Sequence, residues 1–235
     1  PESRKGVVAG GLAVLLAACD TFEINKIYFA PGALRRGVLY TLLEKNNGYD
    51  LRDYSLELLL KQTSCDLKYC RRQANQSLTF FKMLRPNANV EIQKLVYWAA
   101  MSLDIGKKIS PNRHHHHSAY LLKNCHLAGF SKTQQDWVAN LVLGHRGKLE
   151  KIQTYLADED WCSSLLALRI VALLNHEDNP IIFDKIELKT LKIGHWIIKI
   201  KEPNWLDLHP LTFFLLRHEV DVWKALKYKI DIEFE

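Results

Sequence analysis

The chain has 235 residues, of which 48% are apolar and 25% are charged, and its formal net charge is +6. The length allows one large domain or two modest ones, and the composition is ordinary for a globular protein. No apolar run is long enough to cross a membrane, which argues against a membrane-spanning protein. The longest run, Val7 to Cys19, contains two glycines and precedes no cleavage pattern, so we interpret it as a buried helix rather than a signal peptide. The five cysteines form no CxxC pair, which predicts reduced, structural thiols in a cytosolic protein.

The positive charge is concentrated in one part of the chain. Between Lys61 and Lys151 there are 15 Lys and Arg residues against 5 Asp and Glu residues, and six of the ten histidines lie in the same window. The last 55 residues are balanced, with 9 of each sign. A concentrated basic block indicates a polyanionic partner such as polyphosphate, a nucleotide, nucleic acid or an acidic membrane. The alternative is a solvated surface that is merely rich in lysine.

The first 46 residues predict a helix, a strand and a second helix. We expect the helix over residues 2–23, the strand over 25–30 and the second helix over 31–44. A break with turn residues follows, and Asp50 is a candidate N-cap for the next helix. A single strand cannot form a sheet, so the chain looks like the tail of a longer protein whose other strands are missing.

Residues 50–176 read as helical almost throughout, because apolar residues recur at spacings of three and four. The clearest helical segments are residues 51–62, 66–84, 89–106, 132–145 and 161–176. The pattern then changes to β-branched and alternating residues, which are typical of strands. In this last part we expect strands over 181–189, 195–201 and 229–235, with a helix over 209–227. The sequence therefore predicts an α+β chain that is mostly α: an all-α domain followed by a small α+β unit.

Several segments together resemble the exopolyphosphatase/guanosine pentaphosphate phosphohydrolase (Ppx/GppA) family. They are INKIYFAPGALRRGVLYTLLE, KLVYWAAMSLDIG, HHHSAYLLKNCHLAGFSKTQQ and LVLGHRGKL, in that order. The resemblance covers essentially the whole chain and matches the C-terminal half of the family. It implies that residues 1–46 end the second lobe of an actin-like (ribonuclease H-like) core. It further implies that residues 47–178 form a helical HD-like domain and residues 179–235 a small α+β C-terminal domain.

The resemblance also implies an activity for the parent protein. It would be an exopolyphosphatase that hydrolyses the terminal phosphate of inorganic polyphosphate with Mg²⁺, and the alternative is a guanosine pentaphosphate phosphohydrolase. The family's catalytic carboxylate and phosphate loops lie N-terminal to this chain, so we expect no catalytic residue here and an inactive fragment. The sequence contains no P-loop that could replace them. Arg35 matches a family arginine, whereas Arg36 stands where the family usually has glutamate.

An HD-type metal site would need histidines and aspartates from several segments. The matching segment contains Leu103 where the family of HD enzymes has histidine, and it is followed by Asp104. No histidine precedes His114, and one aspartate cannot hold a metal, so we predict no metal site and no cofactor bound by this chain. The run His114 to His117 could bind a metal adventitiously, although a structural zinc site normally draws four ligands from two separated places.

The favoured hypothesis is contact with a polyanion. Arginine and lysine bind phosphate oxygens directly, and a histidine ring can donate an N–H and gains charge as the pH falls. The candidate polyphosphate-binding residues are Lys107, Lys108, Arg113, His115, His117, His145, Arg146, Lys148 and Arg35. We expect binding to strengthen between about pH 8 and pH 6 as histidines become charged. The alternative for His117 and His145 is a structural histidine between helices.

The remaining expectations concern aromatic residues and partners. Trp98, Trp137 and Trp161 lie on apolar helical faces and are expected to pack in the core, as is Tyr120. The expected partners are inorganic polyphosphate, the N-terminal actin-like domains of the parent and a second copy in a homodimer. A membrane is not expected, nucleic acid is disfavoured, and the expected location is cytoplasmic. A third class of function stays open, in which the chain is a non-catalytic module that binds polyanions or RNA or mediates dimerisation.

Overall fold

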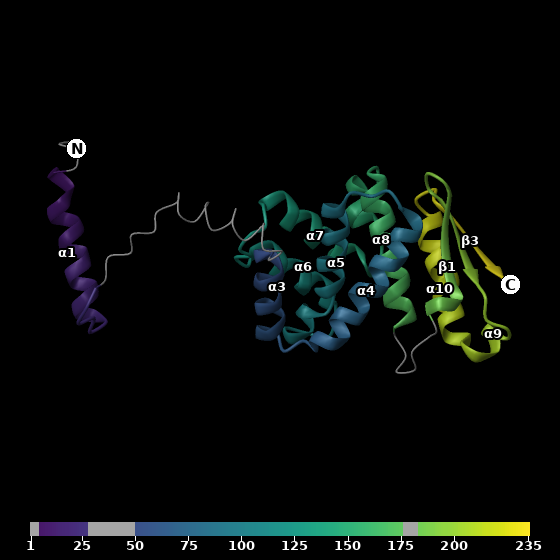
Figure 1. Ribbon diagram of the computed structural model, residues 1–235, viewed down its shortest axis with the longest axis horizontal. Helices are drawn as coiled ribbons and strands as arrows, with labels where there is room; N and C mark the ends of the chain where they lie inside the picture. The colour runs from purple at the N-terminus through teal and green to yellow at the C-terminus, as the bar shows by residue number, and fades with distance from the viewer. Residues whose placement is uncertain (1–4, 28–49, 176–182) are drawn as a thin grey trace. The chain divides into compact units, whose positions relative to one another are not determined.

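The computed structural model describes residues 5–27, 50–175 and 183–235 (Figure 1). The chain divides into two compact units, residues 1–49 and residues 50–235. In the first unit the predicted helix is confirmed as α1, Lys5–Thr21, but its expected burial is not found, because its apolar side chains, Val7 and Val14 among them, are exposed. Residues 24–27 have no regular structure. The rest of the predicted strand, the helix over 31–44 and Arg35 lie outside the described residues.

The helices of the second unit agree closely with the hydrophobic pattern. They are α3 (Leu51–Gln62), α4 (Leu67–Leu84), α5 (Val90–Met101), α6 (His114–Asn124), α7 (Lys132–Gly144) and α8 (Glu159–Leu174). The predicted cap is confirmed, because the Asp50 side chain accepts the Arg52 backbone N–H at 3.1 Å. Ser131 and Gln134 form a reciprocal capping box at the start of α7. Helix α6 was not among the predicted helices, because its first turn is made of four histidines rather than apolar residues.

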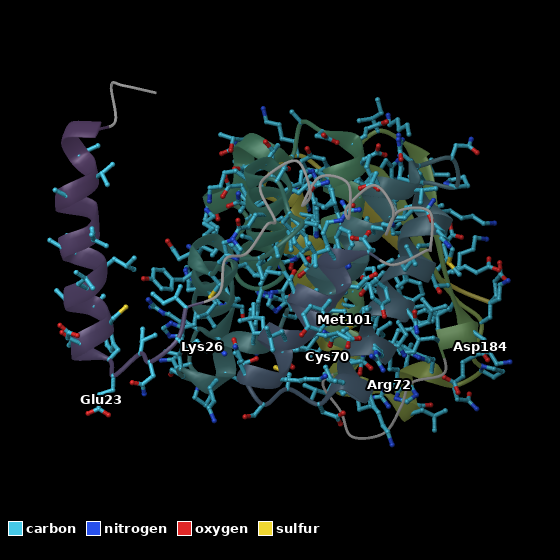
Figure 2. The ribbon with its side chains drawn as sticks, turned by 60° about the vertical axis from the view of Figure 1, so that its left-hand side comes forward. Glu23, Lys26, Cys70, Arg72, Met101 and Asp184 are labelled. Carbon is cyan, nitrogen blue, oxygen red and sulfur yellow. The ribbon has the colours of Figure 1, made fainter. Side chains whose placement is uncertain are left out.

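Helix α8 lies between the other helices of the unit and the part that contains the sheet and α10 (Figure 1), and most of its residues are buried. Its neighbours supply large apolar side chains such as Phe80 and Phe81, which are 1% and 0% exposed. Cys70 and Met101 are also buried in this core, whereas Arg72 lies at the surface (Figure 2). Burial of this apolar area is the main stabilising term for the unit.

A three-stranded sheet follows the helices (Figure 1). Strand β1 (Ile186–Lys192) pairs antiparallel with β2 (His195–Ile200), and β2 pairs parallel with β3 (Lys229–Phe234). A parallel pair needs a crossover, which is supplied by α9 (Trp205–Leu208) and α10 (Pro210–Lys224). These elements confirm the predicted helix and the last two strands, and the prediction of an α+β chain that is mostly helical. The first strand is shifted from its predicted range of 181–189, because Phe183–Lys185 form a 3-10 helix and β1 begins only at Ile186.

The sheet and α10 pack against the helices within one unit. The Thr190 hydroxyl donates to the Leu84 carbonyl at 3.1 Å, and the Tyr228 hydroxyl donates to the Leu156 carbonyl at 2.9 Å. The domain boundary predicted at residue 178 falls outside the described residues. The actin-like and HD-like assignments remain predictions. Among the described residues no helix is long and apolar enough to span a bilayer.

Two expectations about individual side chains can be judged. Trp98 and Trp161 are each 1% exposed and Trp137 is half-buried against the core, as expected. The expectation for Tyr120 is wrong, because its side chain is 63% exposed. Tyr120 lies on the outer face of α6, while Ser118 and Ala119 face inward. All five cysteine thiols are free of disulfide bonds in the structure, and the reduced state remains a prediction.

Candidate functional site

A cavity of about 830 Å³ lies within the second unit. Its walls come from α4, from the 3-10 helix η2 (Ile105–Lys108), from the start of α6, from residues 145–150, and from α8 and α10. Its polar lining includes Lys107, His114, His145, Arg146 and Lys148. We call this cavity the His–Arg pocket. Its volume is in the range of pockets that bind small molecules.

Arg169 on α8 holds the segment that follows α7 in place. The guanidinium Nη1 of Arg169 donates to the carbonyl of Gly144 at 2.7 Å and to the carbonyl of Gly147 at 3.0 Å. Gly144 leaves little room for a side chain, because a Cβ there would lie 3.0 Å from the Leu165 side chain and 3.2 Å from that of Ile152. Gly147 has φ +75°, a conformation that favours glycine. These contacts explain the Gly-His-Arg-Gly motif as a fixed turn, with Arg146 and Lys148 exposed in the pocket lining.

Arg169 is itself fixed by a buried ion pair. Its guanidinium donates to both carboxylate oxygens of Glu219 on α10, at 2.7 Å for Nη2 to Oε2. Arg169 is 3% exposed and Glu219 is 4% exposed, and the Trp223 indole also donates to Glu219 at 2.6 Å. A buried pair of this kind is tolerated because every charged atom has partners. The turn at residues 144–147 is therefore connected to α10 through α8.

His145 is a buried, neutral member of the pocket. Its Nδ1 lies 2.6 Å from the Val142 carbonyl, so Nδ1 carries the proton and donates it, which leaves Nε2 as an acceptor. Burial holds the pKa of His145 well below 6.5. The ring lies 5.7 Å from that of His114 and 6.1 Å from that of His115, between centroids. His145 therefore contributes shape and a hydrogen-bond acceptor, not a positive charge, at neutral pH.

His114 begins α6 next to the carboxylate of Asp104. The His114 Nε2 lies 3.6 Å from Asp104 Oδ1, and Lys107 Nζ lies 2.8 Å from Asp104 Oδ2. Burial lowers the pKa of His114, and the Asp104 carboxylate partly opposes that effect. His114 was not among the predicted site residues, although it is the histidine of the run that lines the pocket. The sequence signal for this part of the pocket was the Leu-Asp-Ile-Gly segment, in which Asp104 matches the aspartate of the His-Asp pair of HD enzymes.

Ser118 joins α6 to η2 at the floor of the site. Its hydroxyl donates to the Leu103 carbonyl at 2.9 Å and accepts the Gly106 backbone N–H at 2.8 Å. A Cβ on Gly106 would lie 2.2 Å from the His114 carbonyl oxygen, so the two backbones approach too closely for any side chain. The His-Ser-Ala-Tyr and Leu-Asp-Ile-Gly motifs are thus two halves of one contact, which fixes Asp104, Lys107 and His114 relative to one another.

The structure brings some of the predicted site residues together and separates others. Residues Lys107, His145, Arg146 and Lys148 line the His–Arg pocket, whereas Lys108, Arg113, His115 and His117 are not among its lining residues. The reason is that the histidine run is helical, so successive side chains point in different directions. His115 is buried, with Nδ1 unpaired, and its Nε2 lies 3.8 Å from the position a Cβ on Gly147 would take. The phosphate-binding role of all these residues remains a prediction.

The expected gain of charge between pH 8 and pH 6 is wrong for most of the histidines. Burial lowers the pKa of His114, His115 and His116, to about 3 for His115, and the charge of Lys151 lowers that of His115 and His116 further. His115 therefore stays neutral where it was expected to become a cation, and the shift of the other two rings has the same direction. Burial lowers the pKa of Lys151 to about 8, and the positive charge of Arg169 lowers it further. The Lys151 Nζ donates to the Arg146 carbonyl at 2.7 Å.

The charges that line the pocket are of both signs. Lys107 is paired with Asp104 and Arg169 with Glu219, while Arg146 and Lys148 form no ion pair with any described residue. Two carboxylates, Glu150 and Asp221, also line the pocket. No group of three or more His, Cys, Asp or Glu side chains that could hold a metal occurs in the part of the chain that is described. Asp104 and His114 alone are an incomplete ligand set.

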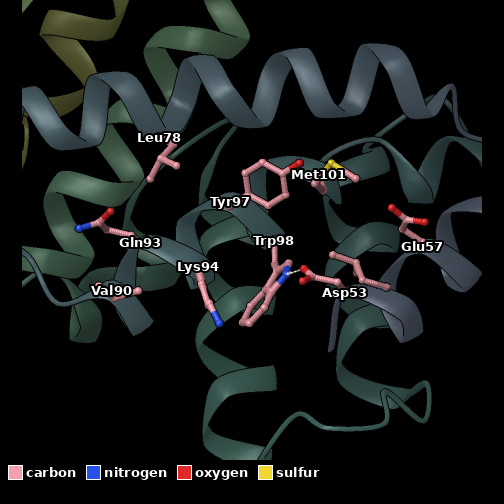
Figure 3. A pocket seen from close by; sticks show the side chains of 10 residues that line it. Asp53, Glu57, Leu78, Val90, Gln93, Lys94, Tyr97, Trp98 and Met101 are labelled. Carbon is pink, nitrogen blue, oxygen red and sulfur yellow. Dashed lines mark hydrogen bonds between the residues drawn. The ribbon is translucent and has the colours of Figure 1, made fainter. Parts of the chain in front are cut away.

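A second, smaller cavity of about 470 Å³ lies between α3, α4 and α5 (Figure 3). Its floor includes Trp98, whose indole N–H donates to Asp53 at 2.6 Å. The carboxylates of Asp53 and Glu57 stand on one side, and Lys94 stands on the other (Figure 3). Because the acidic side chains would repel a phosphate, this cavity is a weaker candidate for an anion than the His–Arg pocket.

Comparison with known proteins gives a family and several relatives. The model of the family "Ppx/GppA phosphatase, domain III" matches residues 51–220. A protein of Pseudoalteromonas translucida named guanosine-5'-triphosphate,3'-diphosphate pyrophosphatase is 27% identical over 97% of this chain and 47% of its own length. Proteins of the same name from Vibrio atlanticus and Aeromonas hydrophila are each 28% identical, over 98% and 93% of the chain and 47% and 45% of their own lengths. The chain therefore spans about half the length of the curated relatives it matches.

Proposed function

Because the chain belongs to the Ppx/GppA phosphatase family, we propose that it is the C-terminal part of a phosphatase that acts on guanosine-5'-triphosphate,3'-diphosphate, and that its His–Arg pocket binds phosphate groups. The family match supports a phosphatase. The names of the relatives support the nucleotide substrate, which the sequence offered as an alternative, better than inorganic polyphosphate. This chain would bind and orient the anion, and bond cleavage would fall to residues outside it.

The observation that carries this proposal is the position of Arg146 and Lys148. Both side chains are exposed in the pocket lining, and both lie on a turn fixed by Arg169. An arginine and a lysine without ion-pair partners are suited to phosphate oxygens, since the guanidinium can bind two oxygens at once and the ammonium supplies a compact charge. Preorganisation of the turn lowers the entropy that would be lost on binding.

Neutral histidines complement these cations. Because the pKa of His145 is held well below 6.5, the ring adds no charge, and its Nε2 can accept a hydrogen bond from a protonated phosphate or a sugar hydroxyl. Lys107 is already paired with Asp104, so its ammonium would be shared between that carboxylate and the ligand. We therefore expect affinity to depend mainly on Arg146 and Lys148.

The test is isothermal titration of guanosine-5'-triphosphate,3'-diphosphate and of inorganic polyphosphate into the 235-residue chain. The variant Arg146→Ala/Lys148→Ala should lose about tenfold or more in affinity, since hydrogen bonds to charged groups contribute roughly 1.5–3 kcal/mol each. The matched control is Lys61→Ala/Lys82→Ala, which also removes two exposed cations but leaves the pocket intact. If both variants lose the same affinity, the loss reflects net charge rather than the pocket, and the proposal is contradicted.

A further inference from the structure

The His–Arg pocket has one apolar wall, in contrast to the charged turn that carries Arg146 and Lys148. Helix α8, helix α10 and the turn that follows α10 supply this wall, and it contains Leu173, Leu215, Val222, Ala225 and Leu226. Leu173, Leu215, Val222 and Leu226 are half-buried. A pocket that only received inorganic phosphate would gain nothing from such a wall, because apolar surface does not solvate a phosphate. The wall fits a ligand that has an apolar, planar part as well as a charged part.

A carboxylate that pairs with no cation of the described residues lies at this wall. Asp221 lines the pocket on α10, next to Val222 and one turn before Ala225, so it lies on the same face of the helix as Ala225. Asp221 is exposed and forms no ion pair with any described residue. Glu219, two residues earlier, is fully engaged by Arg169 and Trp223. Helix α10 thus presents one carboxylate used for structure and one that is available to a ligand.

The geometry points to a guanine-base subsite on α10, and this inference rests on the proposed function. We propose that the base packs against Leu173, Val222 and Leu226, and that the Asp221 carboxylate accepts its two adjacent N–H donors. Guanine presents the ring N–H and the exocyclic amine side by side, which matches the two oxygens of a carboxylate. Adenine presents an acceptor in place of the ring N–H, so the same carboxylate disfavours it. The phosphates then extend to Arg146 and Lys148.

The other carboxylate of the lining, Glu150, is a poorer candidate for the base. It follows Lys148 by two residues, on the segment that carries the cations, and it does not belong to the apolar wall. A carboxylate there would oppose the phosphates rather than meet the base. The variant Glu150→Gln should therefore leave the preference for guanine unchanged, in contrast to Asp221→Asn.

The experiment titrates GTP, ATP and inorganic tripolyphosphate separately into the 235-residue chain. GTP and ATP differ only in the base, and tripolyphosphate keeps the three phosphates but lacks the whole nucleoside. We expect GTP to bind about tenfold more tightly than ATP and than tripolyphosphate, because a bidentate carboxylate contact is worth on that order. In Asp221→Asn the affinity for GTP should fall to that for ATP, while the control Asp207→Asn, an exposed aspartate of α9, should keep the preference.

A second variant tests the apolar wall without touching the carboxylate. Ala225→Trp fills the wall side of the pocket, so it should weaken GTP and ATP about equally and spare tripolyphosphate. If the unmodified chain binds all three ligands equally and Arg146→Ala/Lys148→Ala weakens all three, the base subsite is wrong and the proposed phosphate-binding role stands. If the chain binds none of the three, both proposals are wrong. If GTP is preferred but Asp221→Asn keeps that preference, the assignment of the subsite to Asp221 is overturned.

Discussion

Arg169 and Glu219 form a buried ion pair that connects the middle of α8 to α10, and the same arginine also binds the carbonyls of Gly144 and Gly147. One side chain therefore fixes the turn that carries Arg146 and also orients the helix that supplies the apolar wall of the pocket. The two walls of the His–Arg pocket are consequently held at a fixed spacing by a contact between residues fifty positions apart.

Removing this arginine should damage both stability and the pocket. Arg169→Ala leaves the Glu219 carboxylate buried without its charge partner, which typically costs about 3–5 kcal/mol of unfolding free energy. The double variant Arg169→Met/Glu219→Leu removes both charges and should recover much of that stability without restoring the turn. Urea unfolding measures the first effect, and titration with tripolyphosphate measures the second. Full recovery of binding in the double variant would show that the tether is irrelevant to the site.

Gly106 should tolerate no side chain. Because a Cβ there would lie 2.2 Å from the His114 carbonyl oxygen and 2.4 Å from the Ser118 backbone nitrogen, Gly106→Ala must push α6 away from η2. We expect a loss of about 1–3 kcal/mol, as for other overpacked positions, and a weakened pocket. The control is Gly10→Ala in α1, where nothing lies within 4 Å and alanine should favour the helix. Unchanged unfolding of Gly106→Ala, measured by urea titration, would refute this close approach.

The buried histidines predict acid sensitivity. The folded pKa of His114, His115 and His145 lies below the unfolded value of about 6.5, so the unfolded chain binds more protons as the pH falls. Their contribution to stability is complete above pH 6.5 and is lost progressively towards pH 3. The urea midpoint should therefore fall with pH in this window, and His115→Gln should flatten the dependence more than His126→Gln, which alters an exposed ring. An equal response of the two variants would contradict this explanation.

Anion binding should lack the histidine-driven gain on acidification that the sequence predicts. Since burial keeps His115 and His145 neutral, these rings should add nothing to the affinity for tripolyphosphate between pH 8 and pH 6. Affinity should instead fall with added salt, because charge contacts are screened. Isothermal titration at three pH values and two salt concentrations checks both statements. A rise of tenfold or more at pH 6 would mean that these rings become charged when the ligand binds.

The helices and strands could be predicted because their signals are local. Asp50 as an N-cap, the apolar spacing of α4 and the β-branched pair Ile197 and Ile198 of β2 are all visible in short stretches of the sequence. The pocket could be predicted only in part. Arg146 and Lys148 were found by charge, but the buried pair of Arg169 and Glu219 depends on two residues far apart in the chain, and no local pattern marks it.

The histidine run shows the same limit. From the sequence, the four histidines were expected to act together. Nothing in the sequence indicated that Ser118 would connect α6 to η2. In the helix, His114 faces Asp104 while Tyr120 is exposed, and these directions follow from the packing of α6 on Gly106. Burial then reverses the electrostatic expectation, since it lowers the pKa of the rings that were expected to supply charge. Because burial depends on the tertiary structure, the sequence alone could not predict the direction of these pKa shifts.

The most direct test of the central claim is a ¹H–¹⁵N correlation experiment on the labelled 235-residue chain during titration with guanosine-5'-triphosphate,3'-diphosphate. We expect the largest amide shifts at residues 145–148 and at Lys107, with further shifts on α10 around Asp221. We expect no shifts at the residues that line the cavity around Asp53 and Trp98. Shifts that cluster at that second cavity, or no shifts at millimolar ligand, would contradict the assignment of the His–Arg pocket as the site that binds the phosphates.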